Sequence, residues 1–174
     1  KGINVQAATT QTTATNDGKL RKNGVLFTGI SDNKYYKRGV FTKYTGWKNW
    51  KGNRYYLKKG KAVTGWKYLR DYSGSRTKYK YYFKKNGQAY TNALVSGAIY
   101  DSEGKRVDAE DGAAYMLYTT EADITDDDGT TVLIPEGTQV IVNRSGSVKK
   151  NGSAEVDGVD YDIDNYVATE DIDE

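Results

Sequence analysis

The sequence of 174 residues contains no cysteine, no histidine and only one proline. Without cysteine and histidine, the chain cannot form a disulfide framework, a thiolate or imidazole zinc site, or a Ser-His-Asp catalytic triad. It also lacks a run of about 18 apolar residues, which is the length that a membrane-spanning helix needs. We therefore expect no membrane span, and we assign no catalytic residue, no metal and no cofactor.

Acidic residues are scarce in the first part of the sequence. Residues 1–100 carry 21 Lys/Arg and 3 Asp/Glu, a balance of +18, whereas residues 101–174 carry 5 and 20, a balance of −15. The first hundred residues also hold all three tryptophans and 12 of the 16 tyrosines. This division predicts two modules with different surfaces, separated near residues 95–112.

A short pattern recurs in the basic part. Each copy has a Tyr-Tyr pair, a basic turn that ends in glycine, and then a threonine in most copies. The copies read KYYKRGVFT at 34–42, NRYYLKKGKAVTGW at 53–66 and KYYFKKNGQAYTN at 80–92. The turn glycines are 15, 21 and 27 residues apart, at Gly24, Gly39, Gly60 and Gly87. The last spacing becomes 20 if seven residues near Asp71–Lys78 are an insertion.

A period near 20 residues with one turn glycine per copy predicts a β-hairpin in each copy. Tyr, Trp, Val and Thr favour strands, and glycine supplies the positive φ of a tight turn. Neighbouring side chains of a strand point to opposite faces, so one ring of each Tyr-Tyr pair packs inward while the other lines an outer groove. Because one hairpin is not stable alone, we predict an all-β fold in which the hairpins stack as a solenoid over residues 17–95.

Residues 20–94 resemble the cell-wall-binding repeats of Gram-positive surface proteins, a group that includes choline-binding modules and glucan-binding repeats. The resemblance rests on Gly46-Trp47, Tyr55-Tyr56, Gly60, Thr64-Gly65-Trp66, Tyr81-Tyr82, Gly87 and Thr91. It implies ligand sites between consecutive hairpins, lined by aromatic rings. Choline modules usually carry a tryptophan before the Tyr-Tyr pair, where this sequence has Lys34, Arg54 or Lys80. A positive charge there repels a quaternary ammonium, which favours a glycan or an anionic polymer as the ligand.

The candidate ligand-binding residues are aromatic and basic. Flat Trp and Tyr faces suit sugar rings, and Lys and Arg suit phosphate or carboxylate groups. The alternative for any one repeat tyrosine is a place in the core, because aromatic rings are the main apolar content of so polar a sequence. The predicted set is Trp47, Trp66, Tyr55, Tyr56, Tyr81, Tyr82, Arg54 and Lys80.

The acidic part predicts a small barrel over residues 112–174. Short apolar strands alternate there with glycine turns, and Asp160, Asp162 and Asp164 alternate with apolar residues in the manner of a strand with one wet face. IPEGTQVIV at 134–142 and NYVATEDI at 165–172 resemble parts of the bacterial SH3-like domain, which implies a peptide ligand. Calcium binding at these aspartates or at Asp126–Asp128 is the weaker alternative to an exposed strand face and a hairpin turn.

The sequence thus predicts a secreted, non-catalytic protein of the bacterial cell wall or extracellular space. Its expected partner is a cell-wall polysaccharide, teichoic acid or glucan. The alternatives are binding to single-stranded nucleic acid, which would not explain the Gly-Trp periodicity, and an adhesive spacer without a discrete ligand. Residues 1–16 are polar, and Val5-Gln6-Ala7 is similar to the end of a secretory signal, so we expect a disordered leader or signal remnant there.

Overall fold

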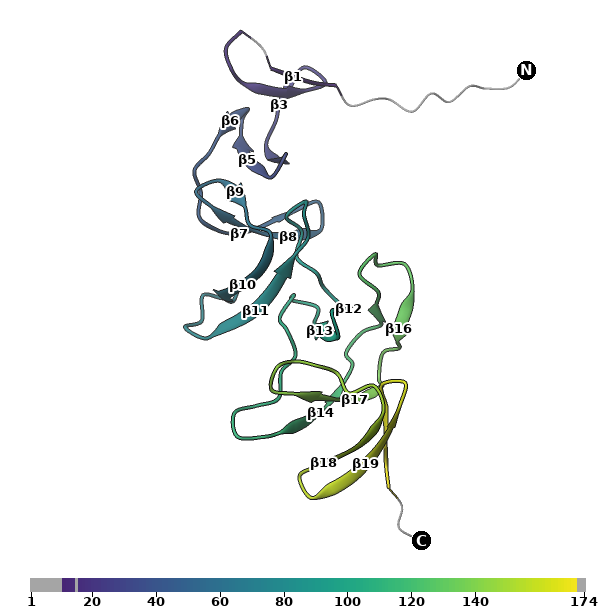
Figure 1. Ribbon diagram of the computed structural model, residues 1–174. Coiled ribbons are helices and arrows are strands. Elements are labelled where there is room, and N and C mark those ends of the chain that lie inside the picture. Colours follow the sequence, from purple (N-terminus) through teal and green to yellow (C-terminus); the bar gives the residue numbers. More distant parts are fainter. Residues whose placement is uncertain (1–10, 15, 172–174) are drawn as a thin grey trace, which may run out of the picture. The chain divides into compact units, whose positions relative to one another are not determined.

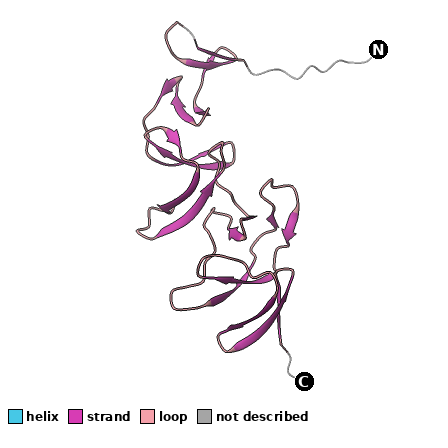
Figure 2. Ribbon diagram, viewed as in Figure 1, coloured by secondary structure: helices cyan, strands magenta, loops and turns pink. Residues whose placement is uncertain are grey.

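The computed structural model describes residues 11–14 and 16–171 (Figure 1). Every regular element in these ranges is a β-strand, and no helix is present among them (Figure 2). The predicted all-β class is therefore confirmed. Of the predicted leader, residues 1–10 and 15 lie outside the described ranges, whereas Thr12–Ala14 forms strand β1 and pairs with β2.

The chain divides into two compact units. The first comprises the residues up to Thr64 together with Lys85–Gln88, and the second comprises Gly65–Lys84 with the residues from Ala89 onward. The strands of the first unit are β1 (Thr12–Ala14), β2 (Leu20–Lys22), β3 (Val25–Leu26), β4 (Gly29–Ser31), β5 (Lys34–Lys37), β6 (Val40–Phe41), β7 (Gly46–Trp50), β8 (Asn53–Lys58) and β9 (Lys61–Ala62). They form the sheet β1-β2-β3 and the sheet β4-β5-β9-β8-β7, with β6 paired to β5.

The second unit contains smaller sheets. Its strands are β10 (Gly65–Arg70), β11 (Lys78–Phe83), β12 (Ala93–Val95), β13 (Ala98–Tyr100), β14 (Tyr115–Thr119), β15 (Ile124–Thr125), β16 (Val132–Ile134), β17 (Gln139–Asn143), β18 (Gly152–Val156), β19 (Val159–Asp164) and β20 (Val167–Glu170). They pair as β10-β11, β13-β12-β15-β16, β14-β17 and β18-β19-β20.

Five turn glycines pack against the hairpin that precedes them, whereas Gly24 has open space around it. A Cβ atom on Gly60 would lie 3.0 Å from Cε2 of Phe41, and one on Gly104 would lie 3.2 Å from the carbonyl oxygen of Tyr90. Gly39, Gly87 and Gly146 make equivalent approaches to Leu26, Ala62 and Arg106. Glycine is thus required both for the turn itself and for the close contact between consecutive hairpins.

Two threonines that each precede a glycine, Thr28 and Thr45, contribute to the contacts between hairpins. The Thr28 hydroxyl accepts a hydrogen bond from the Arg38 backbone N–H, and the Thr45 hydroxyl accepts one from the Lys59 N–H, both at 2.9 Å. Each donor lies in the turn of the next hairpin, where no strand partner is available. Thr28 and Thr45 therefore each tie their own segment to the turn of the following hairpin.

The hairpin pattern continues beyond residue 95, where the sequence analysis ended it. Tyr100 pairs with Arg106 around Gly104, and Val142 pairs with Val148 around Gly146, as Leu57 pairs with Ala62 around Gly60. These later copies lack the Tyr-Tyr pair and the basic turn. The same backbone pattern therefore continues although the amino-acid composition changes.

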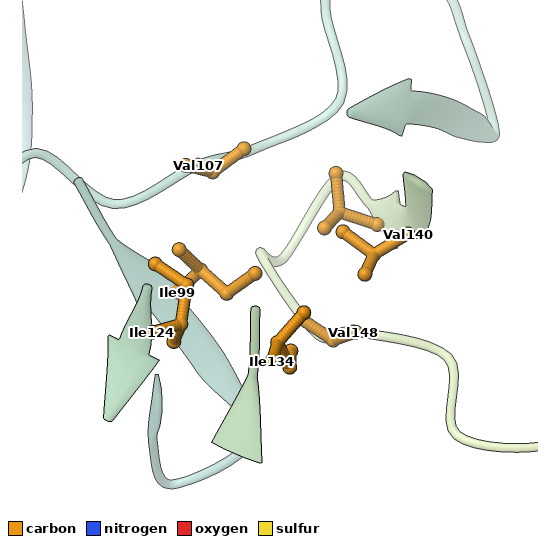
Figure 3. Packing of buried hydrophobic residues seen from close by; sticks show 7 residues of the cluster. Ile99, Val107, Ile124, Ile134, Val140 and Val148 are labelled. Atoms are coloured by element: carbon orange, nitrogen blue, oxygen red, sulfur yellow. The ribbon is translucent and has the colours of Figure 1, made fainter. Parts of the chain in front are cut away.

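One buried cluster spans the predicted boundary near residues 95–112. Ile99 and Val107 pack with Ile124, Ile134, Val140 and Val148 (Figure 3). In addition, β12 pairs in parallel with β15. These contacts join residues on the two sides of the predicted boundary, and the predicted division into modules stays a prediction.

The strands predicted for the acidic part are present. In β19, Tyr161 and Ile163 are buried while Asp160, Asp162 and Asp164 are exposed, which confirms the predicted wet face. Asp126 closes the turn between β15 and β16 by accepting hydrogen bonds from the N–H groups of Thr130 and Thr131. In the described residues these strands belong to separate sheets, one of which includes β12 and β13. The SH3-like barrel stays a prediction.

Candidate ligand-binding site

Two hairpins present a tryptophan and a tyrosine in the same register. In β7–β8, Trp47 lies opposite Tyr56, and in β10–β11, Trp66 lies opposite Tyr82. A glycine precedes the tryptophan in each hairpin and lies opposite a buried apolar residue. Gly46 lies opposite Leu57, and Gly65 lies opposite Phe83. The two hairpins are thus structural equivalents (Figure 1).

The predicted insertion lies at the tip of the second hairpin. Strands β10 and β11 are joined by a long loop at 71–77, whereas β7 and β8 are joined by Lys51 and Gly52. Asp71 orders this loop, because its carboxylate accepts hydrogen bonds from the Ser73 hydroxyl and the Ser75 N–H. The hydrogen bond from Ser73, helped by the Ser75 N–H and by Lys105, lowers the pKa of Asp71. The insertion therefore leaves the register of the Trp66–Tyr82 pair unchanged.

The two tyrosines of each Tyr-Tyr pair point to opposite faces. Tyr55 and Tyr81 are only 3% and 1% exposed, so they lie in the core and not on a groove. Burial raises the pKa of Tyr81 to about 12. Tyr56 and Tyr82 are partly exposed. The outward tyrosines of the predicted set are therefore Tyr56 and Tyr82.

The remaining predicted residues share the outward faces of these hairpins. Cross-strand partners and alternate residues of a strand lie on one face of a sheet. The register therefore places Trp47, Tyr56 and Arg54 on one face of β7–β8. It places Trp66, Tyr82 and Lys80 on one face of β10–β11. The ligand-binding role of all eight residues stays a prediction.

Trp66 is the most open of the three tryptophans, with 45% of its surface exposed. Its ring centre lies 5.0 Å from that of Tyr82 and 5.8 Å from that of the buried Tyr100. Tyr90 stacks on Tyr82 at 5.4 Å with an angle of 14° between the rings. Four rings thus form one aromatic cluster, in which Trp66 offers the accessible face.

Arg106 is a member of this cluster that the sequence analysis missed. Its guanidinium carbon lies 5.5 Å from the centre of the Trp66 ring. The Arg106 Nη2 group donates a hydrogen bond of 3.2 Å to Asp108, and the Arg106 N–H donates one to the Lys80 carbonyl. The segment AIYDSEGKRV at 98–107 has an aromatic residue, a turn glycine and a basic residue. This pattern in the sequence could have identified Arg106 as a candidate.

Tyr68 is a second residue that the sequence analysis missed. It is 61% exposed and lies two residues after Trp66 on β10, opposite Lys80. The register therefore places it on the same outward face, and it extends the aromatic surface toward the tip of the hairpin. Trp50, in contrast, packs edge-on against Phe27 at 5.9 Å and belongs to the core of the first unit.

The described part of the chain contains neither a metal-binding cluster nor a membrane-spanning helix. No three or more Asp or Glu side chains come together there in a way that could hold a metal ion. Within the same ranges, no helix has the length and apolar character needed to cross a membrane.

No protein-family model and no curated protein matches the sequence. Solved structures do resemble it. The modular autolysin LytC from Streptococcus pneumoniae, in complex with a synthetic peptidoglycan ligand, has a TM-score of 0.52 and 16% identity, over 93% of this chain and 34% of that one. The same autolysin in a second structure has a TM-score of 0.53 and 16% identity, over 92% and 31%. This chain therefore shares its fold with part of the autolysin and spans about a third of its length.

Proposed function

We propose that this chain is a non-catalytic binding module for a bacterial cell-wall polymer. The observation that carries the proposal is the repeated outward pair, Trp47 with Tyr56 and Trp66 with Tyr82, held in the same register by two equivalent hairpins. A polymer with a repeating unit is the ligand that gains most from such repeated sites, because one binding event raises the local concentration for the next. The fold shared with the autolysin supports this proposal.

The chemistry of the faces suits a polysaccharide, teichoic acid or glucan. An accessible indole face such as that of Trp66 packs against the C–H side of a sugar ring, and Arg54 and Lys80 donate to its hydroxyl or anionic groups. The Arg106 guanidinium lies over Trp66, where a ligand cation would otherwise bind. We therefore assign a glycan or an anionic group, and not choline, to the Trp66 site.

The finer predictions belong to the same proposal. The hairpins would stack as a solenoid, residues 112–174 would form an SH3-like barrel able to take a peptide, and the protein would act outside the cell. The contacts between turn glycines and preceding hairpins support the solenoid.

Sedimentation with purified cell walls tests the proposal. We expect the Trp47→Ala/Trp66→Ala double variant to lose at least about tenfold in retention, since stacking contributes roughly 1–3 kcal/mol per ring in comparable sites. The matched control is Tyr72→Ala, which removes an exposed ring from the 71–77 loop. Circular dichroism establishes that each variant is folded. Equal retention of both variants and the unmodified protein would support the adhesive-spacer alternative instead.

A separate assay tests the non-catalytic assignment. The purified protein is incubated with peptidoglycan and with glucans, and soluble fragments are measured against a heat-denatured sample. We expect no release above that control. Time-dependent release of fragments would show that the chain is an enzyme.

A further inference from the structure

Three lysines lie opposite one another across neighbouring strands of the first unit. Lys58 on β8 pairs with Lys61 on β9, and Lys61 pairs with Lys34 on β5. Directly opposite residues share one face of a sheet, with Cβ atoms about 4.5–5.5 Å apart, and like charges in such positions repel. The sheet therefore holds a row of ammonium groups at a cost in stability.

The row borders a groove with more lysines. This groove has a volume of about 560 Å³ and is lined by Phe41, Lys43, Lys58, Lys59, Lys61, Ala62 and Val63. Four of the seven lining residues are lysines, and Phe41, Ala62 and Val63 supply apolar surface between them. The groove thus combines a dense positive charge with room for a ligand of several groups.

Carboxylates do not neutralise these charges within the described ranges. None of the groove lysines forms an ion pair there, and neither does Lys34. The sequence explains this, because residues 18–64 contain 13 Lys/Arg and a single acidic residue, Asp32. The positive potential of the row is therefore available to an external anion.

We infer that this groove binds a linear phosphodiester polymer, with successive phosphates along the row of Lys34, Lys61 and Lys58. A polymer fits better than a single anion, because the charges extend over three strands. Phosphate fits better than carboxylate, because lysine binds phosphate as a point charge whereas paired recognition of carboxylate favours arginine, and the groove has no arginine.

The groove favours a phosphodiester polymer without nucleobases. Binding of single-stranded nucleic acid uses exposed aromatic faces on which bases stack. Phe41 is the aromatic residue among those that line the groove, and its ring packs against Gly60 and lies edge-on to Tyr36 at 6.1 Å. It offers little open face to a base, so a nucleotide strand in the groove would gain little stacking from the residues that line it.

This inference deepens the proposed function, since it names the charged class of wall polymer. Lys58 follows Arg54 and Tyr56 at alternate positions on β8, so the row continues the outward face of that hairpin. The aromatic pair would hold sugar or polyol carbon and the row would hold phosphate. The two contributions are separable, because the lysines can be changed without altering any ring.

The test measures binding of poly(glycerol phosphate) by the full chain, with dextran as an uncharged polymer. We expect Lys58→Gln/Lys61→Gln to weaken binding of the phosphate polymer by at least tenfold and to flatten its salt dependence. The control Lys37→Gln/Lys51→Gln removes the same charge from exposed positions outside the groove and should change binding less than threefold. Lys61→Gln alone should raise the melting temperature at low salt, because it relieves the repulsion within the row.

Each outcome decides the inference. Equal losses in the two double variants would mean that only net charge matters, and tighter binding of a single-stranded oligonucleotide with the same number of phosphates would assign the groove to nucleic acid. Either result overturns the inference. If walls are retained through Trp47 and Trp66 while the Lys58/Lys61 variant binds poly(glycerol phosphate) normally, the inference fails and the proposed function stands. If the protein does not bind cell walls, but Lys58→Gln/Lys61→Gln loses binding of poly(glycerol phosphate) and the control variant does not, the inference stands and the proposed function fails.

Discussion

The guanidinium of Arg106 lies over the ring of Trp66, 5.5 Å from its centre, and also pairs with Asp108. The chain thus places its own cation beside the most exposed of its three tryptophans. The backbone N–H of Arg106 also donates a hydrogen bond to the Lys80 carbonyl, so Arg106 attaches the 98–107 hairpin to β11. The Trp66 face is therefore both a candidate binding surface and a structural contact.

Replacement of Arg106 should destabilise the second unit. The Arg106 side chain is 8% exposed, so Arg106→Ala removes packing against Trp66 and leaves Asp108 without its partner. We expect a loss of about 1–3 kcal/mol in the free energy of unfolding, measured by urea denaturation. Arg106→Lys, which keeps the charge, should lose less than half as much. Equal losses for both variants would mean that the charge over the ring does not contribute.

Choline should not bind at Trp66 in the unmodified chain. The Arg106 guanidinium beside the Trp66 ring repels a quaternary ammonium, so titration with choline should leave the tryptophan fluorescence unchanged. Arg106→Gln should acquire a saturable response, and Arg106→Gln/Trp66→Ala should lose it again. A response of the unmodified protein that disappears with Trp66→Ala would contradict this assignment.

Gly60→Ala should be much more damaging than Gly52→Ala. Both glycines have a positive φ, 81° and 74°, but a Cβ on Gly60 would press on Phe41 and Thr42, whereas one on Gly52 would meet nothing within 4 Å. We expect a loss of about 2–4 kcal/mol for Gly60 and about 1 kcal/mol for Gly52. The difference between the two unfolding free energies measures the contact between hairpins. Similar losses at both positions would show that backbone strain alone is responsible.

Tyr81 should make the protein less stable at alkaline pH. Burial raises its pKa in the folded protein to about 12, above the ordinary value of 10.0, so between these values the unfolded chain releases a proton that the folded chain keeps. Stability therefore falls as pH rises through this window, by up to about 1.4 kcal/mol per pH unit. Tyr81→Phe should reduce this slope in urea titrations, whereas the exposed control Tyr72→Phe should keep it. An unchanged slope in Tyr81→Phe would contradict the expectation.

Sequence periodicity predicts the hairpins, the turn glycines and the insertion before β11. These features depend on local properties of the chain, namely turn geometry and strand preference. The direction of each Tyr-Tyr pair could not be predicted, because both members are equally large and apolar. Only the packing of Tyr55 with Ile30 and Leu57 decides which one turns inward.

Other features depend on contacts between segments that are distant in the sequence. The position of Arg106 over Trp66 follows from the pairing of the 98–107 hairpin with β11, which no local pattern specifies. The predicted boundary follows the charge, which changes near residue 100, whereas the buried cluster around Ile99 and Ile134 includes residues on both sides of that change. Composition describes the surface of this chain better than its core.

The contacts of the turn glycines give the chain a direction. Gly39, Gly60, Gly87, Gly104 and Gly146 each rest on a hairpin that comes earlier in the sequence. During synthesis the N-terminal residues leave the ribosome first, so the surface that receives each glycine emerges before the glycine itself. Each new hairpin can dock as soon as its own turn is complete, without waiting for residues that are still to be made.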